Sequence, residues 1–223
     1  MSAKVLKIRI QGGEPTTDLI LSAHTGGNAE VFPSILKLHV PDNSVIADVT
    51  YGKGVFWKKV DCSKYIVRPS DIQSGVDFRD LPYEAKSIDC VVLDPPYMEG
   101  ATRNTAYSTG QNAFANHYGL REIKQSGDRY HAAILALYLA ACVEADRVLK
   151  PKGVLIVKCQ DEVSANTQRF THIEIITALS AKGYYAKDLF VVVRTNRPVV
   201  SRLKRQVHAR KNHSYFLVFV KPR

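Results

Sequence analysis

The stretch of sequence that decides the fold is Cys90-Val91-Val92-Leu93-Asp94-Pro95-Pro96-Tyr97, an apolar run followed at once by a polar tetrad. The apolar run is short, continuous and β-branched, and a breaker ends it, so it predicts a buried parallel strand. The tetrad therefore lies at the carboxyl end of that strand, where open α/β sheets bind their ligands.

The tetrad itself offers a carboxylate, a free carbonyl and an aromatic ring at one place. Pro95 favours extended geometry at Asp94, and the two prolines stiffen the turn and remove two backbone donors. Asp94 and the Pro95 carbonyl can each accept one hydrogen of the exocyclic amino group of a flipped base, while Tyr97 stacks on its ring. The alternative interpretation is an ordinary Asp-Pro-Pro turn after a strand.

Length and composition favour a single α/β domain over residues 1–223. The chain has 223 residues, of which 45% are hydrophobic and 23% charged, so we expect a globular protein with a sizeable core. No apolar run approaches the roughly 18 residues of a membrane span and no signal peptide is evident, which predicts a cytoplasmic protein without a membrane partner. Four cysteines without a CxxC pair are expected to be reduced: Cys62, Cys90, Cys142 and Cys159.

The charge of the chain is strongly basic and unevenly distributed. The formal net charge is +10, and residues 194–223 contain no Asp or Glu. A segment of one sign predicts a polyanionic partner, most simply nucleic acid, and the alternative is a solvated basic surface. His208 and His213 have no carboxylate or Cys beside them, so no metal site is expected there. The residues predicted to contact nucleic acid are Arg194, Arg197, Arg202, Lys204, Arg205, Arg210 and Lys211.

A glycine loop precedes the tetrad in the chain. Residues 45–49 predict a strand that runs into a loop with Asp48, Gly52 and Gly54, followed by a short helix over 55–60. Such glycines let the backbone approach a ligand closely and expose its N–H groups. Asp71 follows a second predicted strand, about 20 residues after the loop, where an acid binds ribose in dinucleotide folds. The alternative for Asp71 is a helix cap or turn carboxylate.

The remaining segments complete an alternating α/β pattern. Residues 76–82 predict a third short strand with its loop, and residues 98–125 a mobile substrate loop, or else a surface loop pinned by its aromatic residues. Helices are expected over 130–149 and 173–181, and a further buried strand over 154–157.

The end of the chain predicts a hairpin. Residues 184–193 and 215–220 are expected to be strands that pair antiparallel, with residues 194–213 at the tip. This places the positive charge on a basic hairpin or small target-recognition element.

Three features occur in one order: Phe32 on a helix over 32–38, the loop from Asp48 to Gly54, and the tetrad Asp-Pro-Pro-Tyr. Together they resemble the S-adenosylmethionine-dependent DNA methyltransferases that methylate adenine at N6 or cytosine at N4. The resemblance spans roughly residues 30 to 220. It implies a Rossmann-like, doubly wound, mostly parallel sheet of the class I methyltransferases, with the last strand antiparallel. Adenine enzymes usually carry Asp in the tetrad and cytosine enzymes more often Ser, which favours N6 of adenine.

The resemblance also implies a role for individual residues. S-adenosyl-L-methionine is the expected cofactor, with its ribose on Asp71 and its adenine ring against Asp77 and Phe78. The target base would be held by Asp94, Pro95, Pro96 and Tyr97. The methionine end would lie on the loop with Phe32, Asp48, Thr50, Gly52 and Gly54, where Thr50 stands in place of a Phe that is common in the family.

Four alternatives stay open at this point. The first is an RNA methyltransferase that acts on an exocyclic amine, and the second is a DNA cytosine-N4 methyltransferase. The third is an inactive nucleic-acid-binding partner subunit, against which the intact Asp94, Gly52 and Gly54 argue. A dehydrogenase is disfavoured because the loop lacks the third glycine. The recognition sequence, the oligomeric state and the biological role, such as restriction-modification, are not determined by these patterns.

Overall fold

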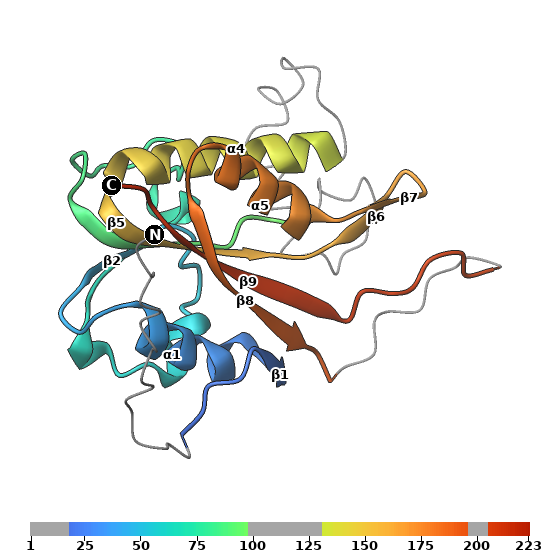
Figure 1. Ribbon diagram of the computed structural model, residues 1–223, viewed down its shortest axis with the longest axis horizontal. Coiled ribbons are helices and arrows are strands. Elements are labelled where there is room, and N and C mark those ends of the chain that lie inside the picture. The colour runs from blue at the N-terminus through green and yellow to red at the C-terminus, as the bar shows by residue number, and fades with distance from the viewer. Residues whose placement is uncertain (1–17, 98–130, 196–204) are drawn as a thin grey trace, which may run out of the picture.

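A computed structural model describes residues 18–97, 131–195 and 205–223. The predicted mobile loop over 98–125 lies outside these ranges, as do Arg197, Arg202 and Lys204. The described residues form a seven-stranded sheet with helices on both faces (Figure 1). The elements, with η for a short 3₁₀ helix, are β1 (Ala23–Thr25), α1 (Asn28–His39), β2 (Val45–Asp48), η1 (Phe56–Lys59), η2 (Cys62–Lys64), β3 (Ile66–Pro69), η3 (Ile72–Ser74), β4 (Ile88–Leu93), α4 (His131–Val148), β5 (Leu149–Cys159), β6 (Glu162–Ser164), β7 (Thr167–Arg169), α5 (Thr171–Ala181), β8 (Tyr185–Val193) and β9 (His213–Val220).

The strand order of the large sheet is β1-β8-β9-β5-β4-β2-β3. All neighbouring pairs are parallel except those of β9, which runs antiparallel to both β5 and β8. This confirms the predicted mostly parallel sheet with an antiparallel last strand, and it confirms the pairing of the last two strands. As a result, the carboxyl ends of β2, β4, β5 and β8 and the amino end of β9 lie at one edge, which we call the carboxyl edge.

Strand β4 explains why the apolar run is continuous. Cys90 and Val92 pack into the hydrophobic cluster on the α1 face, whereas Val91 and Leu93 pack into the cluster beneath α4 and α5. Figure 1 shows α1 on one side of the sheet and α4 with α5 on the other. A strand covered on both faces needs apolar side chains at every position. Asp94 of the tetrad is the first polar residue after the apolar run from Cys90 to Leu93.

One predicted element is wrong. Residues 76–82 form turns and no strand in the structure. The reason is local, because the Asp77 carboxylate accepts hydrogen bonds from the backbone N–H of Arg79 at 2.8 Å and from its guanidinium. The backbone N–H of Leu81 donates to Glu144 of α4 rather than to a neighbouring strand. In the described ranges, no helix combines the length and the apolar character of a membrane span.

Candidate active site

The tetrad follows β4 directly and is tied to the loop after β2. The backbone N–H of Asp94 donates to Thr50 Oγ1 at 2.7 Å. The Tyr97 hydroxyl donates to Asp94 Oδ1 at 2.6 Å, and no hydrogen bond from the described residues reaches Oδ2. The Tyr138 hydroxyl is 3.5 Å from the Pro95 carbonyl and donates at shorter range, 3.0 Å, to the carbonyl of Lys158. One carboxylate oxygen of Asp94 is therefore free to accept.

The protonation of Asp94 is set by opposing effects. Burial raises its pKa to about 6, while the Tyr97 hydrogen bond and the charges of Lys158 and Arg194 lower it. The carboxyl group is thus mostly ionised at neutral pH, and an ionised carboxylate only accepts hydrogen bonds. This is the state that an amino group with two N–H donors needs opposite it.

Asp48, at the end of β2, faces its own loop. Its Oδ2 accepts from Trp57 Nε1 at 2.6 Å, and its Oδ1 accepts from the backbone N–H of Thr50 at 3.1 Å. The residue is 3% exposed, and burial raises its pKa to about 7 against the lowering effect of these hydrogen bonds. Asp48 therefore orders the glycine loop from inside the protein.

The two glycines of the loop have conformations that favour glycine. Gly52 has φ of 51° and Gly54 has φ of 63°, both in the left-handed region. A Cβ on Gly54 would also lie 2.7 Å from the Tyr51 hydroxyl. Among the described residues, the amides of Gly52 and Lys53 donate to no acceptor. These amides are free to bind a ligand.

Phe32 supports the loop from behind. Its ring is fully buried and packs against Trp57 with the ring centroids 5.2 Å apart, and Trp57 in turn donates to Asp48. Phe56 and Phe216 complete the aromatic cluster around it. The family resemblance implies that Phe32 helps to hold the cofactor, which stays a prediction, and in the structure its ring packs against Trp57 just after the glycine loop.

At the end of β3, Asp71 has the capping role that its alternative interpretation expected, and its predicted contact with the ribose stays a prediction. Its Oδ1 accepts from the backbone N–H groups of Gln73 and Ser74, so it caps η3. Ser70, beside it, is 7% exposed, and its hydroxyl has no hydrogen-bond partner in the described residues. The backbone of Ser70 bonds to Asp48 and Tyr51. Sequence reasoning missed this buried hydroxyl, although its position one residue after the strand could have indicated it.

Asp77 and Phe78 both make contacts within the protein. Asp77 forms an ion pair with Arg79 at 2.6 Å, and Phe78 is 1% exposed within the cluster beneath α4. A contact between these two residues and an adenine ring stays a prediction.

The basic segment begins at the carboxyl edge. Arg194 is exposed, and its backbone N–H donates to the Asn212 carbonyl at 2.7 Å. Its positive charge lowers the pKa of Asp94, which opposes the raising effect of burial. Figure 1 shows residues 205–212 extending away from the sheet, and Arg205 and Arg210 are exposed there. Lys211 is half-buried, and its carbonyl accepts from Gln160 Nε2 at 3.4 Å. Arg194 thus belongs to the predicted nucleic-acid segment and also acts on the tetrad through its charge.

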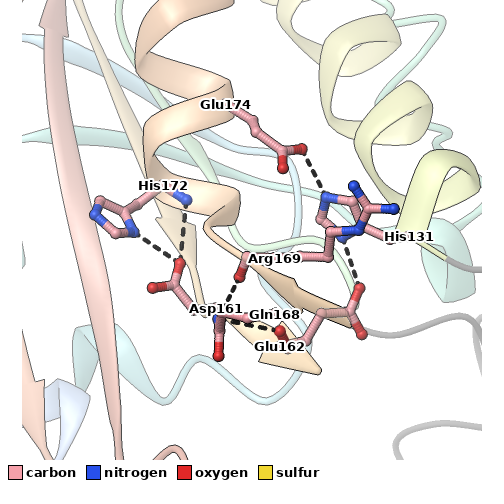
Figure 2. A network of polar contacts seen from close by, with 7 residues as sticks. All are labelled: His131, Asp161, Glu162, Gln168, Arg169, His172 and Glu174. Atoms are coloured by element: carbon pink, nitrogen blue, oxygen red, sulfur yellow. Dashed lines mark hydrogen bonds and ion pairs between the residues drawn. The ribbon is translucent and has the colours of Figure 1, made fainter. Parts of the chain in front are cut away.

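A polar network anchors the hairpin of β6 and β7 next to this edge (Figure 2). His131 of α4 lies between two carboxylates, with Nδ1 2.8 Å from Glu162 and Nε2 2.6 Å from Glu174. His172 Nδ1 lies 2.7 Å from the buried carboxylate of Asp161. These contacts join α4, α5 and β6. None of the His, Cys, Asp and Glu clusters in the described ranges has the arrangement of a metal centre.

The donor groups at the edge fit S-adenosyl-L-methionine. The free amides of the glycine loop suit its carboxylate, and the unpartnered Ser70 hydroxyl suits a ribose hydroxyl. Asp94, ionised near neutral pH, is bonded to the same loop through Thr50, and its negative charge would suit a positively charged sulfonium. The two halves of the predicted site are therefore joined by one hydrogen bond.

Comparison with known proteins identifies the family. The DNA methylase family of the N6/N4 type matches residues 88–223, which is more than half of the chain. The chain belongs to this family, and S-adenosyl-L-methionine is its cofactor, so the predicted family, fold class and cofactor are confirmed. No curated protein matches the chain.

Solved structures with a similar fold are distant in sequence. TrmN from Thermus thermophilus is 15% identical, with a TM-score of 0.49 over 87% of this chain and 50% of that chain. PvuII DNA methyltransferase, described as cytosine-N4-specific, is 14% identical, with a TM-score of 0.44 over 66% of this chain and 49% of that chain. A SAM-dependent methyltransferase from Methanosarcina mazei is 12% identical, with a TM-score of 0.45 over 84% of this chain and 97% of that chain. The chain spans about half the length of the first two proteins.

Proposed function

We propose that this protein transfers a methyl group from S-adenosyl-L-methionine to the N6 amino group of adenine in DNA. The observation that carries the proposal is the Asp94 carboxylate, which is ionised near neutral pH and has one oxygen free of described partners. It follows β4 at the carboxyl edge and is bonded to the glycine loop through Thr50. The Asp-Pro-Pro-Tyr tetrad favours adenine over cytosine within the family.

The side chains of the tetrad would act by holding the amino group. An aromatic amine is a poor nucleophile because its lone pair is delocalised into the ring. Hydrogen bonds from its two N–H groups to Asp94 Oδ2 and the Pro95 carbonyl would favour a pyramidal nitrogen and stabilise positive charge as it develops. Asp94 need not be a strong base, since the proton becomes acidic only as the new nitrogen–carbon bond forms.

The remaining rate enhancement would come from positioning the amine against the methyl group. The cofactor, when bound, provides a methyl group that is already activated on a sulfonium sulfur. The chain must then hold the amine in line with it, and the Asp94–Thr50 hydrogen bond sets the distance between the base site and the glycine loop. Tyr97, whose hydroxyl is fixed on Asp94, would offset lost base stacking by about 1–3 kcal/mol.

The test is transfer of a labelled methyl group to duplex DNA, single-stranded DNA and total RNA offered separately, followed by digestion and identification of the modified nucleoside. We expect N6-methyladenine from DNA. N4-methylcytosine would overturn the choice of base, label in RNA alone would overturn the choice of polymer, and label nowhere would overturn the enzymatic proposal. Cofactor binding, measured by titration calorimetry, is the companion measurement, because absent binding together with absent transfer indicates an inactive partner subunit.

A further inference from the structure

Lys158, the last but one residue of β5, is a lysine enclosed in the core. It is 0% exposed and ranks among the largest fully buried side chains. Its ammonium donates to Ser214 Oγ at 2.5 Å and lies 4.3 Å from the centroid of the Phe216 ring. Both partners belong to β9, the antiparallel strand inserted next to β5. Neither carries a negative charge.

The sheet places Lys158 beside the tetrad. The register pairs Val92 with Ile156 and Leu93 with Val157, so Lys158 lies one residue beyond the last pair, as does Asp94, the first residue after β4. The Lys158 side chain lies on the α1 face, where its ammonium faces Phe216 of that hydrophobic cluster, and the charges of Lys158 and Asp94 act on each other. The two groups form no direct ion pair, so the ammonium acts on the carboxylate through its field.

A buried ammonium is costly unless something compensates its charge. Removing a charge from water without a partner is strongly unfavourable, and an apolar side chain of similar volume would avoid this penalty. A hydroxyl and an aromatic face offset only part of it. Burial lowers the pKa of Lys158 to about 8, and the Asp94 charge acts in the opposite direction. The charge of Lys158 is therefore balanced mainly by Asp94, which suggests a role connected with that carboxylate.

We propose that Lys158 is a positioning residue whose buried ammonium keeps Asp94 ionised, so that the carboxylate can accept the amino group of the target base. This deepens the proposed function and rests on it. Lys158 would touch neither the base nor the cofactor. The ammonium would matter most when a base enters the site. The base would displace water from Asp94, and this desolvation would raise the pKa of the carboxyl group further.

Other groups also act on Asp94, and they must stay constant in a test. Among the described residues they are Tyr97 of the tetrad, Asp48 of β2, Tyr138 of α4, Cys159 of β5 and Arg194 after β8. Of these, Arg194 is the other cation, and it is exposed to solvent. Replacing Lys158 leaves all of them in place.

The experiment is the pH dependence of kcat/KM for parent protein, Lys158→Met and Lys158→Arg. Methionine removes the charge with a side chain only one atom shorter than that of lysine, so we expect the acidic limb of the profile to move up by about one pH unit. With the parent pKa of Asp94 at about 6, this corresponds to about a fivefold loss at pH 6, approaching about tenfold at lower pH. Near pH 8.5 the two profiles should converge, because Asp94 is then ionised in both proteins. Lys158→Arg should restore the parent limb.

A purely structural role predicts a different result, namely an equal loss at every pH. Such a uniform loss, or an unshifted acidic limb in Lys158→Met, would overturn the proposal. Ser214→Ala is the matched control, since it removes the hydrogen bond and keeps the ammonium, and it should leave the acidic limb in place.

A second readout does not depend on turnover. Titration of the Asp94 carboxyl carbon by NMR in the substrate-free protein should give a higher midpoint in Lys158→Met than in the parent. If methyl transfer is never observed but this midpoint rises, the coupling holds and the proposed function fails. If transfer is observed and the midpoint is unchanged, the proposal for Lys158 fails and the proposed function stands.

Discussion

The loop after β2 and the tetrad after β4 make an informative comparison, because each begins with an aspartate at the carboxyl end of neighbouring strands. Both oxygens of Asp48 are used by its own loop, through Trp57 and Thr50. Asp94 has one oxygen bonded to Tyr97 and the other free of described partners. The same residue type at the ends of two neighbouring strands thus orders its own loop in one case and offers a free acceptor in the other.

The surroundings account for this difference. Burial raises the pKa of both carboxyl groups, to about 7 for Asp48 and about 6 for Asp94, and only Asp94 has Lys158 and Arg194 acting against the shift. Thr50 joins the two regions, since its N–H bonds to Asp48 and its hydroxyl accepts from the N–H of Asp94. The position on a strand therefore brings each carboxylate to the carboxyl edge. The neighbouring hydrogen bonds and charges determine whether it orders a loop or stays free to accept a ligand.

The largest effect should come from removing the free acceptor. We expect Asp94→Ala to lower the rate of methyl transfer by at least about 10³-fold, because the amino group loses the ionised group that stabilises its developing charge. Cofactor affinity, measured by calorimetry, should remain close to that of the parent. Retained turnover in this variant would contradict the assignment of the tetrad.

Asp48 should instead control stability and its dependence on pH. Its native pKa is raised, so the folded protein holds a proton that the unfolded chain releases, and the stability gained at low pH is lost as pH rises from about 4 to about 7. At about 1.4 kcal/mol per pKa unit, the loss amounts to about 4 kcal/mol. Asp48→Asn should flatten this slope in urea unfolding followed between pH 4 and pH 8. Parallel profiles for parent and variant would show that Asp48 titrates normally in the folded state.

The bond between the two regions should have a smaller effect. Thr50→Val keeps the shape of the side chain and removes the acceptor for the Asp94 N–H, which costs about 1 kcal/mol and lowers kcat about fivefold. Thr50→Ser is the matched control, because it keeps the hydroxyl, and its kcat should be close to that of the parent. Equal kcat values for the valine and serine variants would mean that the bond does not position the tetrad.

The smallest effect should come from the exposed arginines of the basic segment, over residues 205–212. Arg205→Gln is expected to weaken DNA binding modestly and to reduce the slope of log affinity against log salt by about one. Lys182→Gln removes an equal charge from the exposed end of α5, outside the basic segment, and serves as the control in the same fluorescence anisotropy titrations. An unchanged salt slope in Arg205→Gln would exclude Arg205 from the DNA contact.

Much of the fold could be predicted from the sequence because its signals are local. The run from Cys90 to Leu93 needs burial on both faces, which predicts a central strand, and the expected helix over 130–149 is α4 within two residues. The strand expected over 76–82 failed for an equally local reason, namely the bonds between Asp77 and Arg79, which favour a turn. Asp71 likewise fits a local helix cap, the alternative that its sequence context had offered.

The sequence by itself determined the family, the sheet class, the methyl donor and the two polar segments at the strand ends. Only the tertiary structure decided which partner each polar group meets. Thr50 and Asp94 are 44 residues apart, and Lys158 and Ser214 are 56 apart. These contacts arise from strand pairing, above all from the insertion of β9 between β5 and β8. The physical reason is that the register between distant strands depends on the whole packed sheet, whereas the pattern of one strand depends only on its own side chains.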